Sequence, residues 1–407
     1  MPLRPVVTCA GFALAGWSAL LMLPLSAGTP DISNEGGHVF FVKGMSPQFD
    51  RYIDRASRSD QSWMRQHFFR MVSYSPSFDK NTAWYPDAWF YFDAYAMYWH
   101  REPGGTNLAV EHPEWILGDT KNYPLYIPWG CSGPPEGCPQ YAADVSNPEY
   151  QRWWIDSAKR TLNQARYKGV WIDDVNMDFR VSDVHGNFVT PIDRNTHQEM
   201  REQAWRKYFA EFLENIRKAL PGVEIVHNAI WYAGGELRDR NPEVRREIAA
   251  ADWIYIEKGV NDNGLTANGK WSLTELLAYV DRVHALGKSV VIGNLDGEDQ
   301  STAARLYTLA NYFLISSGRD AVCDWRMGVV PQEWRPELSV ELGAPLDKRK
   351  EWNHLVRRDF VNGIVLVSGP ENPTVSVRLE KSYKTLYGSD TSSVTLAAKQ
   401  ATILLAK

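Results

Sequence analysis

The sequence contains little cysteine, no excess of basic charge and no long apolar run beyond its first residues. Its 407 residues include only 4 cysteines, and Lys+Arg 44 against Asp+Glu 49 leaves a formal net charge of -5. This balance leaves no excess of basic residues for binding phosphate groups, so we expect no nucleic-acid partner. No later run is long and apolar enough to span a bilayer, so we expect no stable membrane partner beyond the N-terminal segment.

Other absences narrow the chemistry and the fold. The chain has no fixed-period repeat and no low-complexity tract. No Gly-rich phosphate turn follows the first expected strand, which weakens a doubly wound open sheet as the alternative architecture. His185 and His197 are too far apart in sequence to form a metal-binding pair, and His112 stands alone beside a proline. We therefore expect no cofactor and no metal.

The N-terminal segment is typical of an export signal. Arg4 supplies a positive start, an apolar stretch covers residues 6–25, and residues 26–28 (Ser-Ala-Gly) suit cleavage. We expect residues 1–28 to be a signal peptide and the protein to be exported to the periplasm or the extracellular space. The length of the apolar stretch also suits an uncleaved membrane anchor.

The cysteines beyond this segment fall into two classes. Cys131 and Cys138 enclose a loop rich in proline and glycine, and in an oxidising compartment we expect them to form a disulfide. Closing so short a loop removes little chain entropy, so the bond would order the loop locally. Cys323 falls in an apolar strand pattern, and we expect it to be a buried small hydrophobe.

The chain is organised around residues 167–175, where an apolar run of strand length ends in Asp173 and Asp174. Upstream, Asn147 and Pro148 indicate a helix start, with Asn at the cap and Pro at the first helical position. A strand buried on both faces is typical of a parallel sheet, which places function at the carboxyl ends of its strands. Asp is also common in turns, so the alternative is that one of the two carboxylates closes the turn and has no other role.

Strand-like and helical runs alternate along most of the chain. The expected strands begin near His38, Phe69, Ala88, Gly169, Glu224, Trp253, Ser289 and Asp320. Helices are expected over residues 196–219 and after Leu273 and Thr302. About eight strands with intervening helices predict a (β/α)₈ TIM barrel over residues 36–345. Short alternating strands then predict a small antiparallel, β-sandwich-like C-terminal domain over residues 355–407.

Acidic and amide residues end most of the expected barrel strands, with aromatic residues beside them. The polar set is Asp93, Asp173, Asp174, Asn228, Glu257, Asn294, Asp296 and Asp324, and the aromatic set is Tyr95, Trp99, Trp231, Tyr232 and Trp325. Carboxylates and amides hydrogen-bond to hydroxyl groups, and aromatic rings cover the apolar faces of sugars. We therefore expect a carbohydrate partner, with Asp93 bonded to ring hydroxyls and Asn228, Trp231 and Asn294 also lining the sugar site.

Glycoside cleavage requires two carboxyl groups that flank one bond. Asp173 and Glu257 end alternate expected strands, the fourth and the sixth, so they can face each other across a barrel mouth. A non-catalytic carbohydrate-binding barrel would keep the aromatic residues and lack a carboxyl pair at this separation. A metal-dependent polysaccharide deacetylase also carries an Asp-Asp pair at a strand end, and it stays as a further alternative.

The strand that ends in Asp173 and Asp174 resembles the one that carries the catalytic Asp in barrel glycoside hydrolases and in poorly characterised glycosyl hydrolase families. Supporting stretches are His112-Pro113-Glu114-Trp115, Asp144-Val145-Ser146-Asn147-Pro148 and Arg357-Arg358-Asp359-Phe360. In retaining α-glycosidases, including the α-galactosidase-like clan, the nucleophile lies on strand four and the acid/base on strand six. The resemblance implies Asp173 as nucleophile and Glu257 as acid/base, although that clan commonly has Asp at the second position.

Asp174 is the competing nucleophile. Because side chains alternate along a strand, we expect Asp173 and Asp174 to face opposite ways, with Asp174 bracing the loop or binding a neighbouring hydroxyl. Glu257 must hold its proton near neutral pH, and we expect burial by Tyr255 and other aromatic residues to favour the protonated form.

Overall fold

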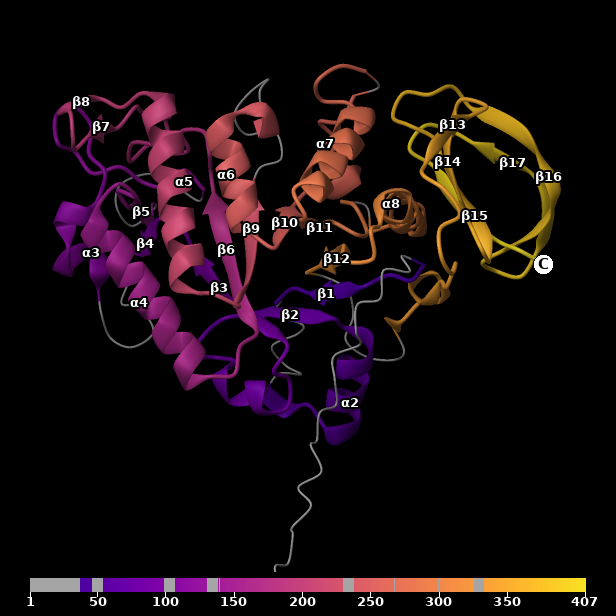
Figure 1. The fold of residues 1–407 in the computed structure, drawn as a ribbon, viewed down its shortest axis with the longest axis horizontal. Helices are drawn as coiled ribbons and strands as arrows, with labels where there is room; N and C mark the ends of the chain where they lie inside the picture. Colours follow the sequence, from indigo (N-terminus) through magenta and orange to yellow (C-terminus); the bar gives the residue numbers. More distant parts are fainter. Residues whose placement is uncertain are drawn as a thin grey trace, which may run out of the picture. The chain divides into compact units, whose positions relative to one another are not determined.

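The computed structural model describes residues 37–45, 54–98, 107–129, 138, 140–229, 238–266, 268–298, 300–325 and 333–407. Within them, eight strands pair in parallel and close into a barrel in the order β1-β12-β11-β10-β9-β6-β3-β2 (Figure 1). The strands are β1 (Phe41–Lys43), β2 (Arg70–Ser73), β3 (Ala88–Asp93), β6 (Gly169–Val175), β9 (Glu224–Ala229), β10 (Trp253–Ile256), β11 (Ser289–Ile292) and β12 (Ala321–Asp324). The predicted (β/α)₈ barrel is confirmed.

Helices connect the barrel strands and cover the outside of the barrel (Figure 1). They are α2 (Arg58–His67), α3 (Leu108–Glu111), α4 (Pro148–Gln164), α5 (Glu202–Ala219), α6 (Pro242–Ala250), α7 (Leu273–Ala285) and α8 (Thr302–Ile315). The predicted start of α4 is confirmed, because the Asn147 side chain accepts a 2.9 Å hydrogen bond from Glu149 N and Pro148 opens the helix. No helix in the described ranges combines the length and apolar character that a membrane span requires.

Short elements fill the long connections between the barrel strands. Two small antiparallel pairs join β4 (Ala96–Tyr98) to β5 (Gln140–Ala142) and β7 (Ile192–Asp193) to β8 (Gln198–Glu199). The 3₁₀ turns are η1 (Asp79–Ala83), η2 (Pro113–Trp115), η4 (Arg238–Arg240), η5 (Gly259–Asn261) and η7 (Pro336–Ser339).

Helix α5 begins later than the sequence predicted. The expected helix over residues 196–219 starts only at Glu202, because the preceding residues form the β7–β8 pair and His197 has a left-handed φ of 56°. Helix α6 was not among the predicted helices. It begins with the same Asn-Pro signal as α4, and the Asn241 side chain accepts a hydrogen bond from Glu243 N at 2.9 Å.

The barrel interior is filled by aromatic side chains. The rings of Trp89 and Trp253 lie 5.4 Å apart, and those of Trp89 and Trp171 lie 6.0 Å apart. At the amino-terminal end of the strands, Arg70 forms a 2.7 Å ion pair with Glu224, which also accepts a 2.7 Å bond from Trp89 Nε1. This packing closes the amino-terminal end of the barrel, so we expect the functional site at the carboxyl ends of the strands. Cys323 is buried and unpaired in the same interior, as predicted.

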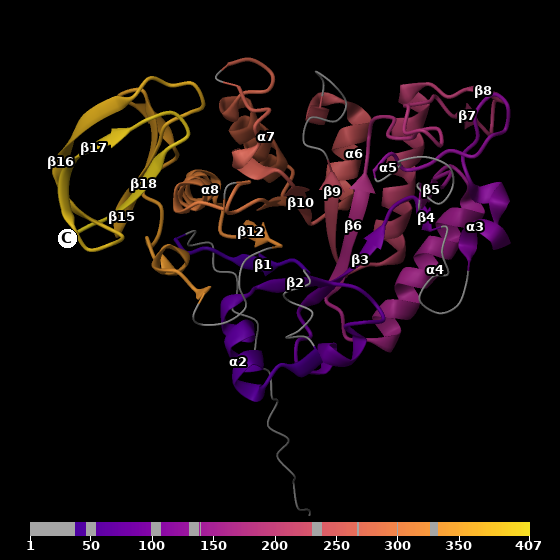
Figure 2. The same ribbon diagram turned by 180° about the vertical axis from the view of Figure 1, so that it is seen from behind.

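The C-terminal strands form one antiparallel sheet of six strands in the order β13-β14-β15-β18-β16-β17. They are β13 (Lys350–Trp352), β14 (Leu355–Phe360), β15 (Gly363–Val367), β16 (Val375–Thr385), β17 (Asp390–Leu396) and β18 (Ala401–Leu405). The sheet curls so that β16 and β17 lie opposite β15 and β18 across an apolar core that includes Leu366 and Tyr383 (Figure 2). The predicted C-terminal β-domain is confirmed, and it packs on α8 through the Phe313 and Phe360 rings, 5.8 Å apart.

Candidate active site

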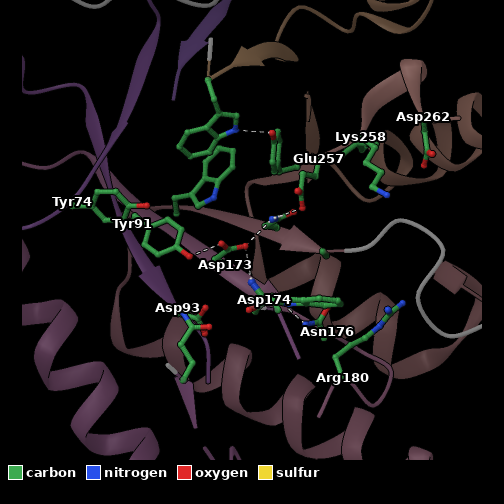
Figure 3. A pocket seen from close by; sticks show the side chains of 18 residues that line it. Tyr74, Tyr91, Asp93, Asp173, Asp174, Asn176, Arg180, Glu257, Lys258 and Asp262 are labelled. Carbon is green, nitrogen blue, oxygen red and sulfur yellow. Dashed lines mark hydrogen bonds between the residues drawn. The ribbon is translucent and has the colours of Figure 1, made fainter. Parts of the chain in front are cut away.

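A cavity of about 720 Å³ lies at the carboxyl ends of the barrel strands (Figure 3). Its lining is rich in carboxylates, which come from β3, β6 and the segment after β10. These carboxylates are Asp93, Asp173, Asp174, Glu257 and Asp262. Aromatic side chains, including Trp129 and Trp325, share the lining with two cations, Arg180 and Lys258. The parallel register brings together residues as far apart in the chain as Tyr74 and Trp325, as in other barrels.

Asp173 accepts three hydrogen bonds inside the cavity. The Tyr91 hydroxyl donates to Oδ2 at 2.5 Å, the Asn228 amide to Oδ1 at 2.7 Å, and the Asp174 backbone N–H to Oδ1 at 2.8 Å. Burial, together with the charges of Asp93 and Asp173, raises the pKa of Tyr91, so its hydroxyl keeps its proton and acts as a donor. Donors to both oxygens hold the Asp173 carboxyl group in a fixed orientation in the cavity.

Asn228 joins the two carboxyl groups of the predicted catalytic pair. Its Nδ2 atom lies 2.7 Å from Asp173 Oδ1 and 3.2 Å from Glu257 Oε2. These two oxygens can therefore be no farther apart than the sum of the two distances, about 5.9 Å. Figure 3 shows the carboxyl groups of Asp173 and Glu257 turned toward each other.

Glu257 lies directly after β10 and is exposed. The expected burial by Tyr255 is wrong, because Tyr255 points into the barrel interior and its hydroxyl accepts a 3.0 Å bond from Trp325 Nε1. Glu257 comes after the last residue of β10, so strand alternation no longer fixes its direction, and it is exposed although Tyr255 is buried. Their backbone approaches β11 closely. A Cβ on Gly293 would meet Glu257 O at 2.2 Å, so only glycine fits there.

Asp174 faces the same cavity as Asp173, contrary to the expected alternation. Its φ is 51°, a left-handed conformation that is uncommon for residues other than glycine. This turn rotates the side chain into the cavity, where Oδ1 accepts bonds from Trp129 Nε1 at 2.9 Å and Asn176 Nδ2 at 3.2 Å. Burial, reinforced by the charge of Asp173, raises the pKa of Asp174 to about 6.

Asp93 and Asp174 line the same cavity, and the charge of Asp174 acts on the Asp93 carboxyl group. Asp93 is buried, and its Oδ1 accepts bonds from Tyr95 N at 2.9 Å and Ala96 N at 2.7 Å. Burial raises the pKa of Asp93 well above its ordinary value, and the charges of Asp174 and Asp173 raise it further. Two adjacent carboxyl groups cannot both ionise readily, so Asp93, with its raised pKa, holds a proton beside Asp174.

The other residues predicted for the site are divided between several places. Trp325 lines the same cavity as Asp173. Asn294 lines a neighbouring cavity instead, and Asp296 forms a 2.6 Å ion pair with Arg305 outside the lining of both. Buried Asp324 ends β12 below the cavity. Trp99, Trp231, Tyr232 and Cys131 lie outside the described residues, so their predicted roles stay predictions.

Several residues of the cavity were not singled out in the sequence. Tyr91 could have been found, because strand alternation places it on the same face as Asp93, two residues later. Trp129 and Arg180 lie in connections whose course the sequence does not indicate, and the Arg180 guanidinium lies 5.8 Å from the Trp129 ring centre. Within the described ranges, no three His, Cys, Asp or Glu side chains lie close enough together to hold a metal ion.

Comparison with known proteins gives one family match and several structural likenesses. A family model described as "Hypothetical glycosyl hydrolase family 15" matches residues 81–364. No curated protein matches the chain.

Among solved structures, a maltogenic α-amylase from Thermotoga neapolitana is 11% identical and has a TM-score of 0.50, with 90% of this chain and 98% of that chain covered. The glycoside hydrolase domain of PelA from Pseudomonas aeruginosa is 14% identical over 63% of this chain and 82% of that domain, with a TM-score of 0.36. A GH36 α-galactosidase from Geobacillus stearothermophilus is 10% identical over 91% and 55%, with a TM-score of 0.47. At these identities, the amylase likeness supports the barrel fold alone.

Proposed function

The chain belongs to hypothetical glycosyl hydrolase family 15 and is a glycoside hydrolase, and we propose that it cleaves an α-glycosidic bond with retention of configuration. The substrate in this proposal is a poly- or oligosaccharide. The observation that carries the proposal is the Asn228 amide, which bonds to both Asp173 and Glu257.

The separation of the two carboxyl groups supports retention. In retaining enzymes the carboxyl groups lie roughly 5–5.5 Å apart, whereas inverting enzymes leave about 6.5–9.5 Å for a water molecule. The upper limit of about 5.9 Å between Asp173 Oδ1 and Glu257 Oε2 falls below the inverting range. This close approach supports direct attack by one carboxylate in the proposed reaction.

The proposed reaction has two steps. Asp173 attacks the anomeric carbon while Glu257 gives its proton to the leaving oxygen, which breaks the glycosidic bond and forms a glycosyl ester on Asp173. Glu257, now ionised, takes a proton from water, and the resulting hydroxide attacks the same carbon and releases Asp173. Glu257 is exposed in the cavity, so the glycosidic oxygen of a bound substrate can reach its carboxyl group.

The hydrogen bonds assign different roles to Asp173 and Asp174. Asp173 is held in place by hydrogen bonds from Tyr91 and Asn228, which suits the nucleophile. Asp174 instead has a raised pKa and accepts a hydrogen bond from Trp129, which suits a hydrogen-bonding partner for sugar hydroxyls. The linkage preference rests on the resemblance to α-glycosidases that carry their carboxylates on the same two strands.

A panel of polysaccharides and aryl α- and β-glycosides tests the proposal, with the purified wild-type protein and its Asp173→Ala variant. We expect the wild-type protein to cleave at least one α-linked member and Asp173→Ala to lose this activity while its thermal unfolding stays cooperative. Cleavage of β-linked members alone would contradict the linkage. Full activity in Asp173→Ala, with loss only in Asp174→Ala, would contradict the choice of nucleophile.

We also propose that the protein is exported and that Cys131 bonds to Cys138. Cys138 is buried, and its Sγ lies 3.2 Å from Val184 O. Thiol titration of the denatured exported protein should find no free thiol from this pair. Two additional reactive thiols without reductant would contradict the bond.

A further inference from the structure

A second cavity of about 480 Å³ adjoins the one that holds the carboxyl pair. The two cavities have Lys258 and Asp262 as common lining residues. Both residues flank the η5 turn that follows Glu257 along the chain. In Figure 3, Lys258 and Asp262 lie on the side of Glu257 that points away from Asp93. The second cavity is therefore reached past Glu257.

The second cavity has the composition of a carbohydrate subsite. Trp271 supplies an aromatic ring, and three amides and two carboxylates supply donors and acceptors around it. These polar residues are Asn261, Asn263, Asn294, Asp262 and Glu298. An aromatic surface with a few polar groups beside it matches a ligand that has apolar ring faces and hydroxyl edges.

The floor of this cavity is held by a network that fixes its shape. The Asn261 amide, at the end of η5, donates to Thr308 Oγ1 at 2.7 Å and to Asn294 O at 3.1 Å. These bonds join the turn after β10 to the turn after β11 and to α8. At the rim, Asn263 Nδ2 donates to Glu298 Oε2 at 3.3 Å, and Asp262 Oδ1 accepts from Gly264 N at 2.8 Å. A cavity already held in shape loses little entropy when it binds a ligand.

From this arrangement we propose that the second cavity binds sugar units on the leaving-group side of the scissile bond, with Trp271 as their stacking surface. This inference rests on the proposed function, in which Glu257 protonates the leaving oxygen. The leaving part of the substrate must lie on the Glu257 side of the bond, and the second cavity is the space beyond that residue. The enzyme then acts on a chain rather than on a single sugar with a small substituent.

The test compares two substrates that share the sugar accepted in the panel. One is its aryl glycoside, which cannot extend into the second cavity as a sugar chain does, and the other is an oligosaccharide of the same sugar and linkage. The measured quantity is the ratio of kcat/KM for the oligosaccharide to kcat/KM for the aryl glycoside. The variants are Trp271→Ala and Asn263→Ala, with Tyr387→Ala as the control for loss of an aromatic residue. Tyr387 is 61% exposed and lines neither cavity.

We expect this ratio to rise with oligosaccharide length in the wild-type protein. In Trp271→Ala it should fall by roughly three- to tenfold, the value of one aromatic contact. Asn263→Ala should lower it by a smaller factor, and Tyr387→Ala should leave it unchanged. Asn263 is exposed at the rim, so this variant carries the test if Trp271→Ala does not fold.

An unchanged ratio in both folded variants would overturn the inference and leave the proposed function standing. A wild-type ratio that does not increase with chain length would do the same. Failure of the wild-type protein to cleave any member of the panel would instead overturn the proposed function, and the inference with it.

Discussion

The side-chain amide of Asn228 donates a 2.7 Å hydrogen bond to Oδ1 of Asp173, across the carboxyl ends of two neighbouring barrel strands, β9 and β6. The same nitrogen donates a 3.2 Å hydrogen bond to Oε2 of Glu257, the residue that follows β10. One side chain thereby contacts both the proposed nucleophile and the proposed acid/base and limits the distance between them.

Replacement of Asn228 by alanine should lower kcat by roughly 10–100-fold, because a hydrogen bond to a charged group contributes about 1.5–3 kcal/mol. Steady-state kinetics on the accepted substrate measures this change. Asn195→Ala is a matched control, since Asn195 donates to Tyr208 at 3.1 Å away from the cavity. An Asn228→Ala enzyme as fast as the control would contradict the role of the amide.

Tyr91→Phe should reduce kcat by a similar factor of roughly 10–100, since it removes the donor to Asp173 Oδ2 and keeps the ring. The control is Tyr208→Phe, which removes a tyrosine hydroxyl bonded at 3.1 Å to Asp193 outside the cavity. Equal activity of the two variants would show that the Tyr91 bond does not support the nucleophile.

The raised pKa of Asp174 predicts a pH dependence of stability. Its pKa rises from 3.8 in the unfolded chain to about 6 in the folded protein, so the folded state binds more protons between these values. The free energy of unfolding contributed by this group is therefore largest below about pH 4 and is lost as the pH rises through about 6.

Urea unfolding of wild-type protein and Asp174→Asn across pH 4 to 7 measures this dependence. An amide does not titrate, so the variant should lack this loss, which is on the order of 2 kcal/mol in the wild-type protein. Parallel pH profiles of the two proteins would contradict the raised pKa.

Gly293→Ala should impair catalysis by displacing Glu257. The added Cβ would meet Glu257 O at 2.2 Å and the Tyr255 hydroxyl at 2.6 Å, so the end of β10 must move. A shift of this kind can cost about 100-fold in rate even without loss of a catalytic group. Gly118→Ala is the control, because its Cβ would meet no neighbouring atom closer than Tyr123 O at 3.6 Å. Equal kcat/KM values for the two variants would contradict the steric argument.

Much of the fold was predictable because burial leaves a direct signal in the sequence. Each expected barrel strand is an apolar run that ends in a polar residue, and the Asn147-Pro148 pair marked α4 correctly. The equivalent signal at Asn241 and Pro242 was present, although α6 was not predicted from it.

The site was less predictable because it depends on backbone angles at strand ends. Asp174 and Asn294 both have left-handed φ values, 51° and 55°, which no residue pattern indicates. At Asp174, this conformation turns the side chain into the cavity, whereas strand alternation would have pointed it away. At Asn294, it accompanies a side chain that lines the neighbouring cavity. Trp129 reaches Asp174 from a long connection whose path only the folded chain defines.

The most direct test of the account is to trap the covalent intermediate. A fluorinated glycosyl fluoride of the accepted sugar slows the second step of a retaining enzyme, so the glycosyl ester accumulates and can be located by peptide mass spectrometry. The account predicts one added glycosyl group on Asp173 in the wild-type protein and none in Asp173→Ala. A label on Asp174, or an active enzyme that forms no adduct and releases product of inverted configuration, would contradict it.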